Sequence, residues 1–151
     1  MTPHGNGTLL IVVEAESFWP SWLGTGQSNL AMVRQRSTET LADLKERVGR
    51  LLGQIDARGG AITYAIFVQS DRCDSAAILT RVGIAGRIVS HMSERAAGRL
   101  VIVPAGAQSS SARAQAALLA EGLRIQVSDL ANVTVVTSDE LNEAAAPRVA
   151  A

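Results

Sequence analysis

The sequence contains one cysteine, few aromatic residues and no excess charge of either sign. Because Cys73 stands alone, an intrachain disulfide and a cysteine metal cage are excluded. Fourteen basic and fourteen acidic residues leave no overall field that favours nucleic acid or an anionic membrane. The early apolar run Leu9–Val13 is too short for a signal-peptide core or a membrane span. We therefore expect a cytoplasmic protein that needs no cofactor and binds neither nucleic acid nor membrane.

What the sequence does have is an apolar content of 47% in 151 residues, which suits one domain with a sizeable core. With two Phe, two Trp and one Tyr, that core must consist mainly of aliphatic side chains and alanine. We expect a single α/β domain over residues 1–151, with residues 1–7 and 144–151 as flexible tails.

The central stretch, residues 61–103, predicts a strand, a helix and a second strand. Ala61–Val68 is a continuous apolar run, which is typical of a strand buried on both faces. Leu100–Pro104 is the returning strand, and the three elements predict a right-handed parallel βαβ unit. Between the strands, apolar residues recur at steps of four and three, which indicates one helical face. That face comprises Ile78, Val82, Ala85, Val89 and Met92.

Off this predicted face lie Arg81 and Arg87, so we expect alanine at either position to change stability by no more than about 0.5 kcal/mol. A clearer amphipathic helix covers residues 38–57, with Ser37 or Thr38 as its cap. An alanine-rich helix is predicted from Ser111 to about residue 130, although alternation over 123–128 also fits a strand.

The remaining strands are expected at 9–13, 30–35 and 132–137. The order β-β-α-β-α-β-α-β predicts a mostly parallel sheet of about five strands with helices on both faces. We pair the first two strands as a wide antiparallel hairpin, which would make one antiparallel edge. Any site should lie outside the carboxyl ends of the parallel strands, near a switch point.

Four acidic residues fall near the predicted carboxyl ends of strands: Glu14, Glu16, Asp71 and Asp74. Carboxylates on neighbouring strands can share a divalent cation. The alternative is that Asp74, or Ser75 beside it, caps the following helix while Asp71 adds favourable charge at its N-terminus. The distance from Glu14 to Asp71 would separate the two interpretations.

A second candidate site lies at the start of the alanine-rich helix, where Ser110 and Ser111 precede Arg113. Exposed backbone N–H groups beside an arginine can bind an anion, and the same residues can simply cap the helix.

The segment 18–22 holds Phe18, Trp19 and Trp22 in a turn-rich context. Large aromatic side chains in a loop either fold back on the core or anchor a contact with another chain.

The layout resembles that of STAS domains, the fold of the anti-sigma-factor antagonists, in which a helix begins with Asp-Ser after a buried strand. Asp74-Ser75 occupies that place here, which would make Ser75 the candidate regulatory hydroxyl. Ala76 follows, where that family commonly has a second hydroxyl residue.

With no convincing catalytic set, we predict a non-enzymatic protein-interaction or regulatory domain. It would contact a partner protein, or a second copy of itself as a homo-oligomer, through segment 18–22. The alternative is a small metal-dependent or nucleotide- or phosphate-binding enzyme that uses the acidic strand ends.

Overall fold

The computed structural model describes residues 7–14, 30–70, 74–95, 98–104, 110–127 and 132–140. The described residues form five strands and three long helices, which alternate after the first two strands, and a further helical segment covers residues 138–140 after the last strand. This segment gives the chain one more helix than the order predicted from the sequence. The elements are β1 (Gly7–Val13), β2 (Leu30–Arg34), α1 (Leu41–Ala57), β3 (Ala61–Gln69), α2 (Ser75–Arg95), β4 (Gly98–Pro104), α3 (Ser110–Gln126) and β5 (Val133–Thr137).

The strands form one sheet in the order β2-β1-β3-β4-β5, and every neighbouring pair is parallel. The predicted antiparallel pairing of the first two strands is therefore wrong. Leu9 pairs with Leu30 and Val13 with Arg34, so β2 runs in the same direction as β1. The chain between these strands is long enough for this arrangement, because a parallel pair needs a connection of about a dozen residues or more.

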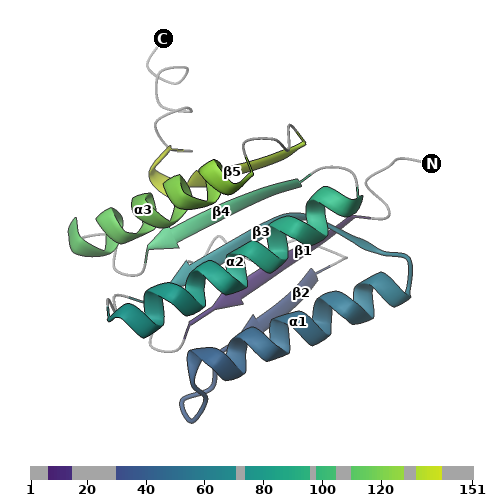
Figure 1. Ribbon diagram of the computed structural model, residues 1–151. Coiled ribbons are helices and arrows are strands. Elements are labelled where there is room, and N and C mark those ends of the chain that lie inside the picture. Colours follow the sequence, from purple (N-terminus) through teal and green to yellow (C-terminus); the bar gives the residue numbers. More distant parts are fainter. Residues whose placement is uncertain are drawn as a thin grey trace.

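All three long helices pack on one face of the sheet, in front of the strands in Figure 1. The expectation that they would cover both faces is wrong for these helices. The three strand–helix–strand crossovers each carry the chain in the same direction across the sheet: β2-α1-β3, β3-α2-β4 and β4-α3-β5. Since such crossovers share one hand, they place their helices on the same side.

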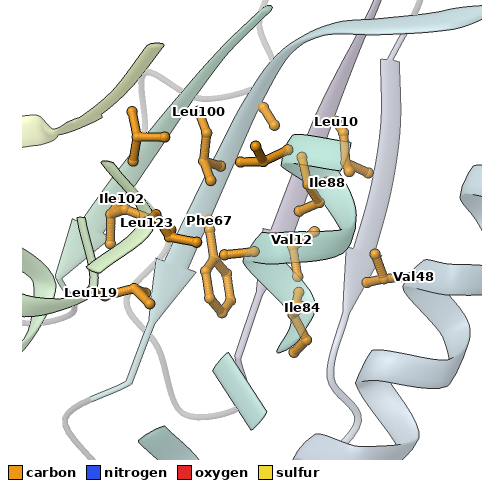
Figure 2. Packing of buried hydrophobic residues seen from close by; sticks show 14 of the residues in the cluster. Leu10, Val12, Val48, Phe67, Ile84, Ile88, Leu100, Ile102, Leu119 and Leu123 are labelled. Atoms are coloured by element: carbon orange, nitrogen blue, oxygen red, sulfur yellow. The ribbon is translucent and has the colours of Figure 1, made fainter. Parts of the chain in front are cut away.

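The main core lies between this face of the sheet and the helices (Figure 2). Phe67 is the largest fully buried side chain among the described residues. The aliphatic residues labelled with it in Figure 2 come from β1, α1, α2, β4 and α3. A second buried cluster occupies the opposite face: Ile11, Val13, Ile66, Val68, Val101 and Val103. Burial on both faces explains why β1, β3 and β4 read as continuous apolar runs instead of alternating ones.

Helix α1 shows the closest agreement with the sequence. Its buried residues are Leu41, Leu44, Val48, Leu52 and Ile55, with Leu51 partly buried. The cap is Thr40, and not Ser37 or Thr38 as the sequence predicted. Its hydroxyl accepts from the Asp43 N–H at 3.1 Å, and Asp43 Oδ2 accepts from the Thr40 N–H at 3.1 Å. This reciprocal capping box fixes the start of the helix, and Gly59 ends it with a positive φ of 74°.

Helix α2 presents a different face to the sheet than the sequence predicted. Its buried residues include Ala77, Arg81, Ile84 and Ile88. In contrast, Ile78 is 44% exposed and Val82 is only partly buried. Compared with the predicted orientation, the helix is rotated about its axis, and its buried stripe contains the charged residue Arg81. Val89, Ala85 and Met92 are buried in both the predicted and the observed stripe.

Helix α3 continues through Leu123 and Ile125 to Gln126, so these residues are helical and not part of an extra strand. Leu123 is buried and Ile125 is 70% exposed. The alternation of apolar residues along 123–128 therefore does not mark one face of a strand.

A buried histidine secures an irregularity in the sheet. The pairing of β1 with β3 shifts register between Thr8 and Leu9, opposite Ile62 and Tyr64. The N–H of Ile62 donates to His91 Nε2 at 3.0 Å, and the other ring nitrogen lies 3.4 Å from Asp56 Oδ1. His91 thus joins α2 to the bulged part of β3 and satisfies a buried backbone donor.

The helical segment after β5 begins with another capping box. The Glu140 N–H donates to the Thr137 hydroxyl at 3.2 Å, and the Thr137 N–H donates to Glu140 Oε1 at 2.8 Å. Arg124 on α3 donates to both oxygens of Glu140 at 3.0 Å. The hydrogen bond from the Thr137 backbone, followed by the Arg124 guanidinium, lowers the pKa of Glu140 from its ordinary value of 4.5.

We predict that Glu140→Gln destabilises the protein at neutral pH, by no more than about 1 kcal/mol because the side chain is partly exposed. A lowered pKa in the folded state means that the contribution is present above about pH 4.5 and is lost as the pH falls through the folded value. Urea unfolding of the parent and of Glu140→Gln, at pH 7 and at pH 4, measures the difference in their free energies of unfolding. Asp139→Asn, next to it, is the control. A difference between parent and Glu140→Gln that is the same at both pH values would contradict the prediction.

Candidate functional site

The candidate site lies where the strand order changes direction. From β1 the chain passes to β2 on one side and returns to β3 on the other, so β1 and β3 flank the switch point of the sheet. Val13 and Val68 are paired, which brings Glu14 and Gln69 to the same edge of the sheet. Ligands of open α/β sheets bind outside the carboxyl ends of the strands at such a point.

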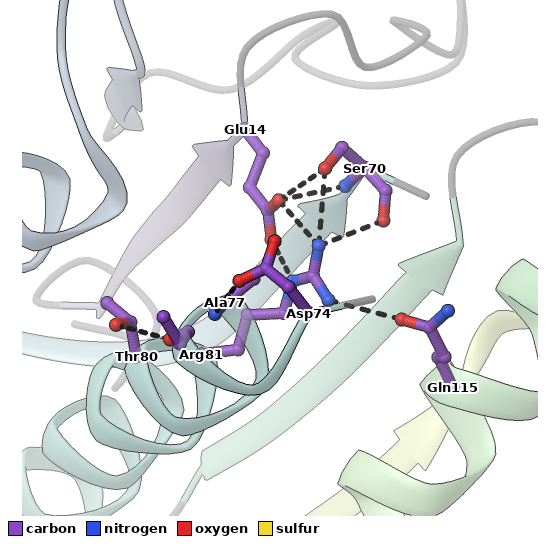
Figure 3. Close-up of polar contacts among 8 residues, drawn as sticks. Glu14, Ser70, Asp74, Ala77, Thr80, Arg81 and Gln115 are labelled. Carbon is purple, nitrogen blue, oxygen red and sulfur yellow. Dashed lines mark hydrogen bonds and ion pairs between the residues drawn. The ribbon is translucent and has the colours of Figure 1, made fainter. Parts of the chain in front are cut away.

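A buried ion pair occupies this edge (Figure 3). Arg81 Nε donates to Glu14 Oε2 at 2.6 Å, and its Nη2 donates to Glu14 Oε1 at 3.0 Å. Ser70 completes the cluster, because its N–H and hydroxyl both donate to Glu14 Oε1, at 3.1 and 2.7 Å. The Arg81 Nη2 also donates to the Ser70 carbonyl at 3.1 Å. The two opposite charges balance, so the cluster adds no net charge to the interior.

The same guanidinium reaches across to α3. Arg81 Nη1 lies 3.3 Å from Gln115 Oε1, in hydrogen-bonding geometry (Figure 3). Arg81 therefore links β1, β3, α2 and α3 through one side chain. Next to this link, a cavity of about 170 Å³ opens between α2 and α3. Its walls are mostly aliphatic and its polar lining is Gln69, Arg81, Gln115 and Gln126; the other lining residues are Ile78, Val82, Leu118, Leu119, Gly122 and Leu123.

Gln69 is the unusual member of this lining. Its side chain is fully buried, yet neither its Nε2 nor its Oε1 has a hydrogen-bond partner among the described residues. Buried polar groups are almost always paired, and an unpaired one costs about 1–3 kcal/mol. The side chain lines the cavity, but its Nε2 and Oε1 are themselves buried in the wall. A rotation of the carboxamide toward the cavity would let it pair with a ligand that offers both an acceptor and a donor.

The acidic residues predicted as metal ligands have different surroundings. Both oxygens of Glu14 are occupied by Arg81 and Ser70. Asp74 Oδ1 accepts from the Ala77 N–H at 2.9 Å, which places Asp74 at the N-cap of α2. Glu16 and Asp71 lie outside the described residues. The distance from Glu14 to Asp71 therefore does not decide here between a metal site and a helix cap. Among the described residues, no three His, Cys, Asp or Glu side chains come together as a metal site.

The other predicted sites are not brought together with this one. Phe18, Trp19 and Trp22 lie outside the part of the chain that the structure describes, and so their contact with a partner stays a prediction. Ser75 is the exposed first residue of α2. Ser111 is exposed near the start of α3, where Ser110 is the first residue, and Arg113 Nε lies 3.4 Å from Asp139.

Reasoning from the sequence missed four residues of the site: Gln69, Ser70, Arg81 and Gln115. One signal was available for Arg81, because it lies four residues after Ala77 and four before Ala85, both of which are buried. A charged residue at such a position is either exposed by a rotation of the helix or paired inside. Gln69 and Gln115 carry no comparable signal, since glutamine is common at strand ends and on helix surfaces.

Comparison with known proteins gives no relative. No family model matches the chain, and neither a curated protein nor a solved structure does so. The resemblance to STAS domains thus has no support beyond the layout and the dipeptide Asp74-Ser75. In the described part of the chain, no helix combines the length and apolar character needed to span a membrane.

Proposed function

We propose that this chain is a non-enzymatic regulatory domain that binds a small neutral ligand in the cavity between α2 and α3. The observation that carries the proposal is the buried Gln69 carboxamide, whose donor and acceptor are both unpaired within the described residues. A cavity of about 170 Å³ accommodates a single ring, since a dry apolar cavity of about 150 Å³ holds benzene.

The chemistry of the lining defines the ligand class. Aliphatic walls favour an apolar body, and the balanced Glu14–Arg81 pair offers no free charge for an ion. The carboxamide pairs best with a cis-amide edge, in which one N–H donates to Gln69 Oε1 and the adjacent carbonyl accepts from Nε2. Lactams, imides and the edges of small heterocycles have this arrangement.

The test uses 2-piperidone, a six-membered lactam, and cyclohexanone, which has a similar ring and carbonyl but no N–H. We expect 2-piperidone to shift the side-chain amide resonance of Gln69 in an NMR titration and to bind at least about fivefold more tightly than cyclohexanone, because one buried hydrogen bond is lost. Equal binding of both compounds, or no response at the Gln69 resonance to either, would contradict the proposal.

Replacing the carboxamide should separate stability from binding. Gln69→Met keeps the length of the side chain and removes two unpaired polar atoms, so we expect the free energy of unfolding to rise by about 1–3 kcal/mol. The same variant should no longer bind 2-piperidone. Gln126→Met, at an exposed residue of the same lining, is the matched control and should change stability by less than about 0.5 kcal/mol. A destabilised Gln69→Met would show that the carboxamide has partners in the folded protein.

A further inference from the structure

The outer edge of β2 differs from the rest of the sheet in its exposure and its charge. Among the described residues, β2 pairs with β1 alone and is the terminal strand of the sheet. Met32 in its centre is 49% exposed. A terminal strand presents unpaired N–H and C=O groups that can pair with another extended chain.

The backbone groups that point outward can be assigned. The Gln35 N–H donates to the Val13 carbonyl at 2.8 Å, so Gln35 faces β1. In a parallel ladder alternate residues direct both backbone groups to the same neighbour. Val33 and Ala31 therefore also face β1, whereas Leu30, Met32 and Arg34 direct their groups to the open edge. The Arg34 carbonyl agrees with this assignment, since it accepts from Arg47 Nη1 at 2.9 Å and not from a strand.

Arginines surround this edge. The groove between β2 and α1 is lined by Arg36, Arg47, Arg50 and Arg58, and Glu39 is the only acidic residue among the described residues of its lining. Arg34 adds a fifth guanidinium on the adjoining surface. Glu39 is already engaged, because its Oε1 accepts from Arg47 Nη1 at 2.6 Å. The edge is therefore strongly basic in a chain whose net charge is zero.

We propose that β2 binds an extended acidic segment of a partner protein, which adds to the sheet as a sixth strand. Backbone hydrogen bonds to Leu30, to Met32 and to the Arg34 N–H would align the segment, since the Arg34 carbonyl already accepts from Arg47. Its carboxylates would lie near Arg36, Arg50 and Arg58. The charge also argues against a second copy of this chain at the same place, since pairing β2 with β2 would bring two sets of arginines together. The proposal is independent of the cavity and of its ligand.

Fluorescence anisotropy with a labelled peptide of alternating valine and glutamate, about eight residues long, tests the proposal. The control peptides replace glutamate with lysine, or intersperse proline to prevent strand formation at the same charge. We expect binding of the valine–glutamate peptide, weakening by about threefold or more when salt screens the arginines, and at least about fivefold weaker binding of the proline-containing peptide. Equal binding of the two acidic peptides would overturn strand addition.

Variants of the protein separate backbone pairing from charge. Met32→Pro removes an N–H that points to the open edge, where proline is tolerated, and should weaken peptide binding by about fivefold or more. The double variant Arg50→Gln with Arg58→Gln should weaken binding and reduce its salt dependence, and it keeps the test valid if Met32→Pro does not fold. Arg87→Gln, on the exposed surface of α2, removes one positive charge away from β2; as the control it should bind as the parent does.

Two results would contradict the proposal. One is unchanged peptide binding by a folded Met32→Pro protein or by the double arginine variant. The other is tighter binding of single-stranded oligothymidylate than of the acidic peptide, lost in the double arginine variant and kept in Met32→Pro. That pattern would assign the arginines to nucleic acid, which needs phosphate contacts and no strand pairing.

Discussion

Replacing Arg81 with alanine should lower the free energy of unfolding by about 3–5 kcal/mol. The Arg81 and Glu14 side chains are only 3% and 1% exposed, so the substitution would leave a buried carboxylate without its cation. It would also remove the hydrogen bonds by which the guanidinium joins Ser70 and Gln115 to Glu14. Urea unfolding of the variant and the parent at neutral pH measures the loss.

Arg87 is the matched control for this experiment, because it lies on the same helix and is exposed. The sequence predicted that alanine at Arg81 or at Arg87 would change stability by no more than about 0.5 kcal/mol. The structure removes the basis of that prediction for Arg81, which is buried, and keeps it for Arg87. Equal and small effects of the two substitutions would mean that the ion pair in Figure 3 contributes little.

A double replacement distinguishes loss of the pair from loss of one charge. Glu14→Leu together with Arg81→Met removes both charges and keeps much of the apolar volume. Since a buried pair exchanged for apolar residues is often nearly neutral, we expect the double variant to be more stable than Arg81→Ala by at least about 2 kcal/mol. A double variant as unstable as the single one would show that Ser70 and Gln115 depend on the guanidinium for their positions.

The fold was predictable from the sequence where a local signal determines it. The apolar run of β3 and the apolar stripe of α1 each follow from residue spacing, and so do the positions of the five strands. The direction of β2 does not, because its residues would read the same in a parallel or an antiparallel pair. A connection of intermediate length fits both arrangements.

The candidate site was less predictable because its contacts are distant in sequence. Glu14 is an acidic residue after a buried strand, a pattern that predicts a ligand of a shared cation. Its partner in the structure, Arg81, is 67 residues away. Nothing in the sequence indicates that the Gln69 carboxamide is buried without a partner among the described residues, since this depends on how α2 and α3 pack over the end of β3.

The sequence predicts the wrong buried face of α2 because the buried stripe includes polar residues. Both Arg81 and His91 are buried, the first against Glu14 and the second against the Ile62 N–H. Placing Arg81 on the exposed side shifts the predicted stripe toward Ile78 and Val82, which are apolar and have the same helical spacing. The two stripes differ by a rotation of the helix, and only the partners on β1 and β3 decide between them.

Substituting aspartate at two isoleucines of α2 tests this rotation. Ile84 is fully buried against the sheet, so Ile84→Asp places an unpaired charge in the core and should cost about 4 kcal/mol or more. That loss is comparable to the whole stability of many domains, about 5–15 kcal/mol. We expect Ile84→Asp to be unfolded or to melt at a much lower temperature than the parent.

Ile78→Asp is the matched substitution, six residues earlier on the same helix. Ile78 is 44% exposed and lies in the first turn of α2, where a carboxylate interacts favourably with the helix N-terminus. The favourable charge offsets part of the lost apolar contact, and we expect a change of no more than about 1 kcal/mol. Circular dichroism melting of both variants decides the face: a folded Ile84→Asp beside an unfolded Ile78→Asp would restore the stripe predicted from the sequence. That result would also remove Arg81 from the core, because Arg81 and Ile84 lie three residues apart on one side of the helix.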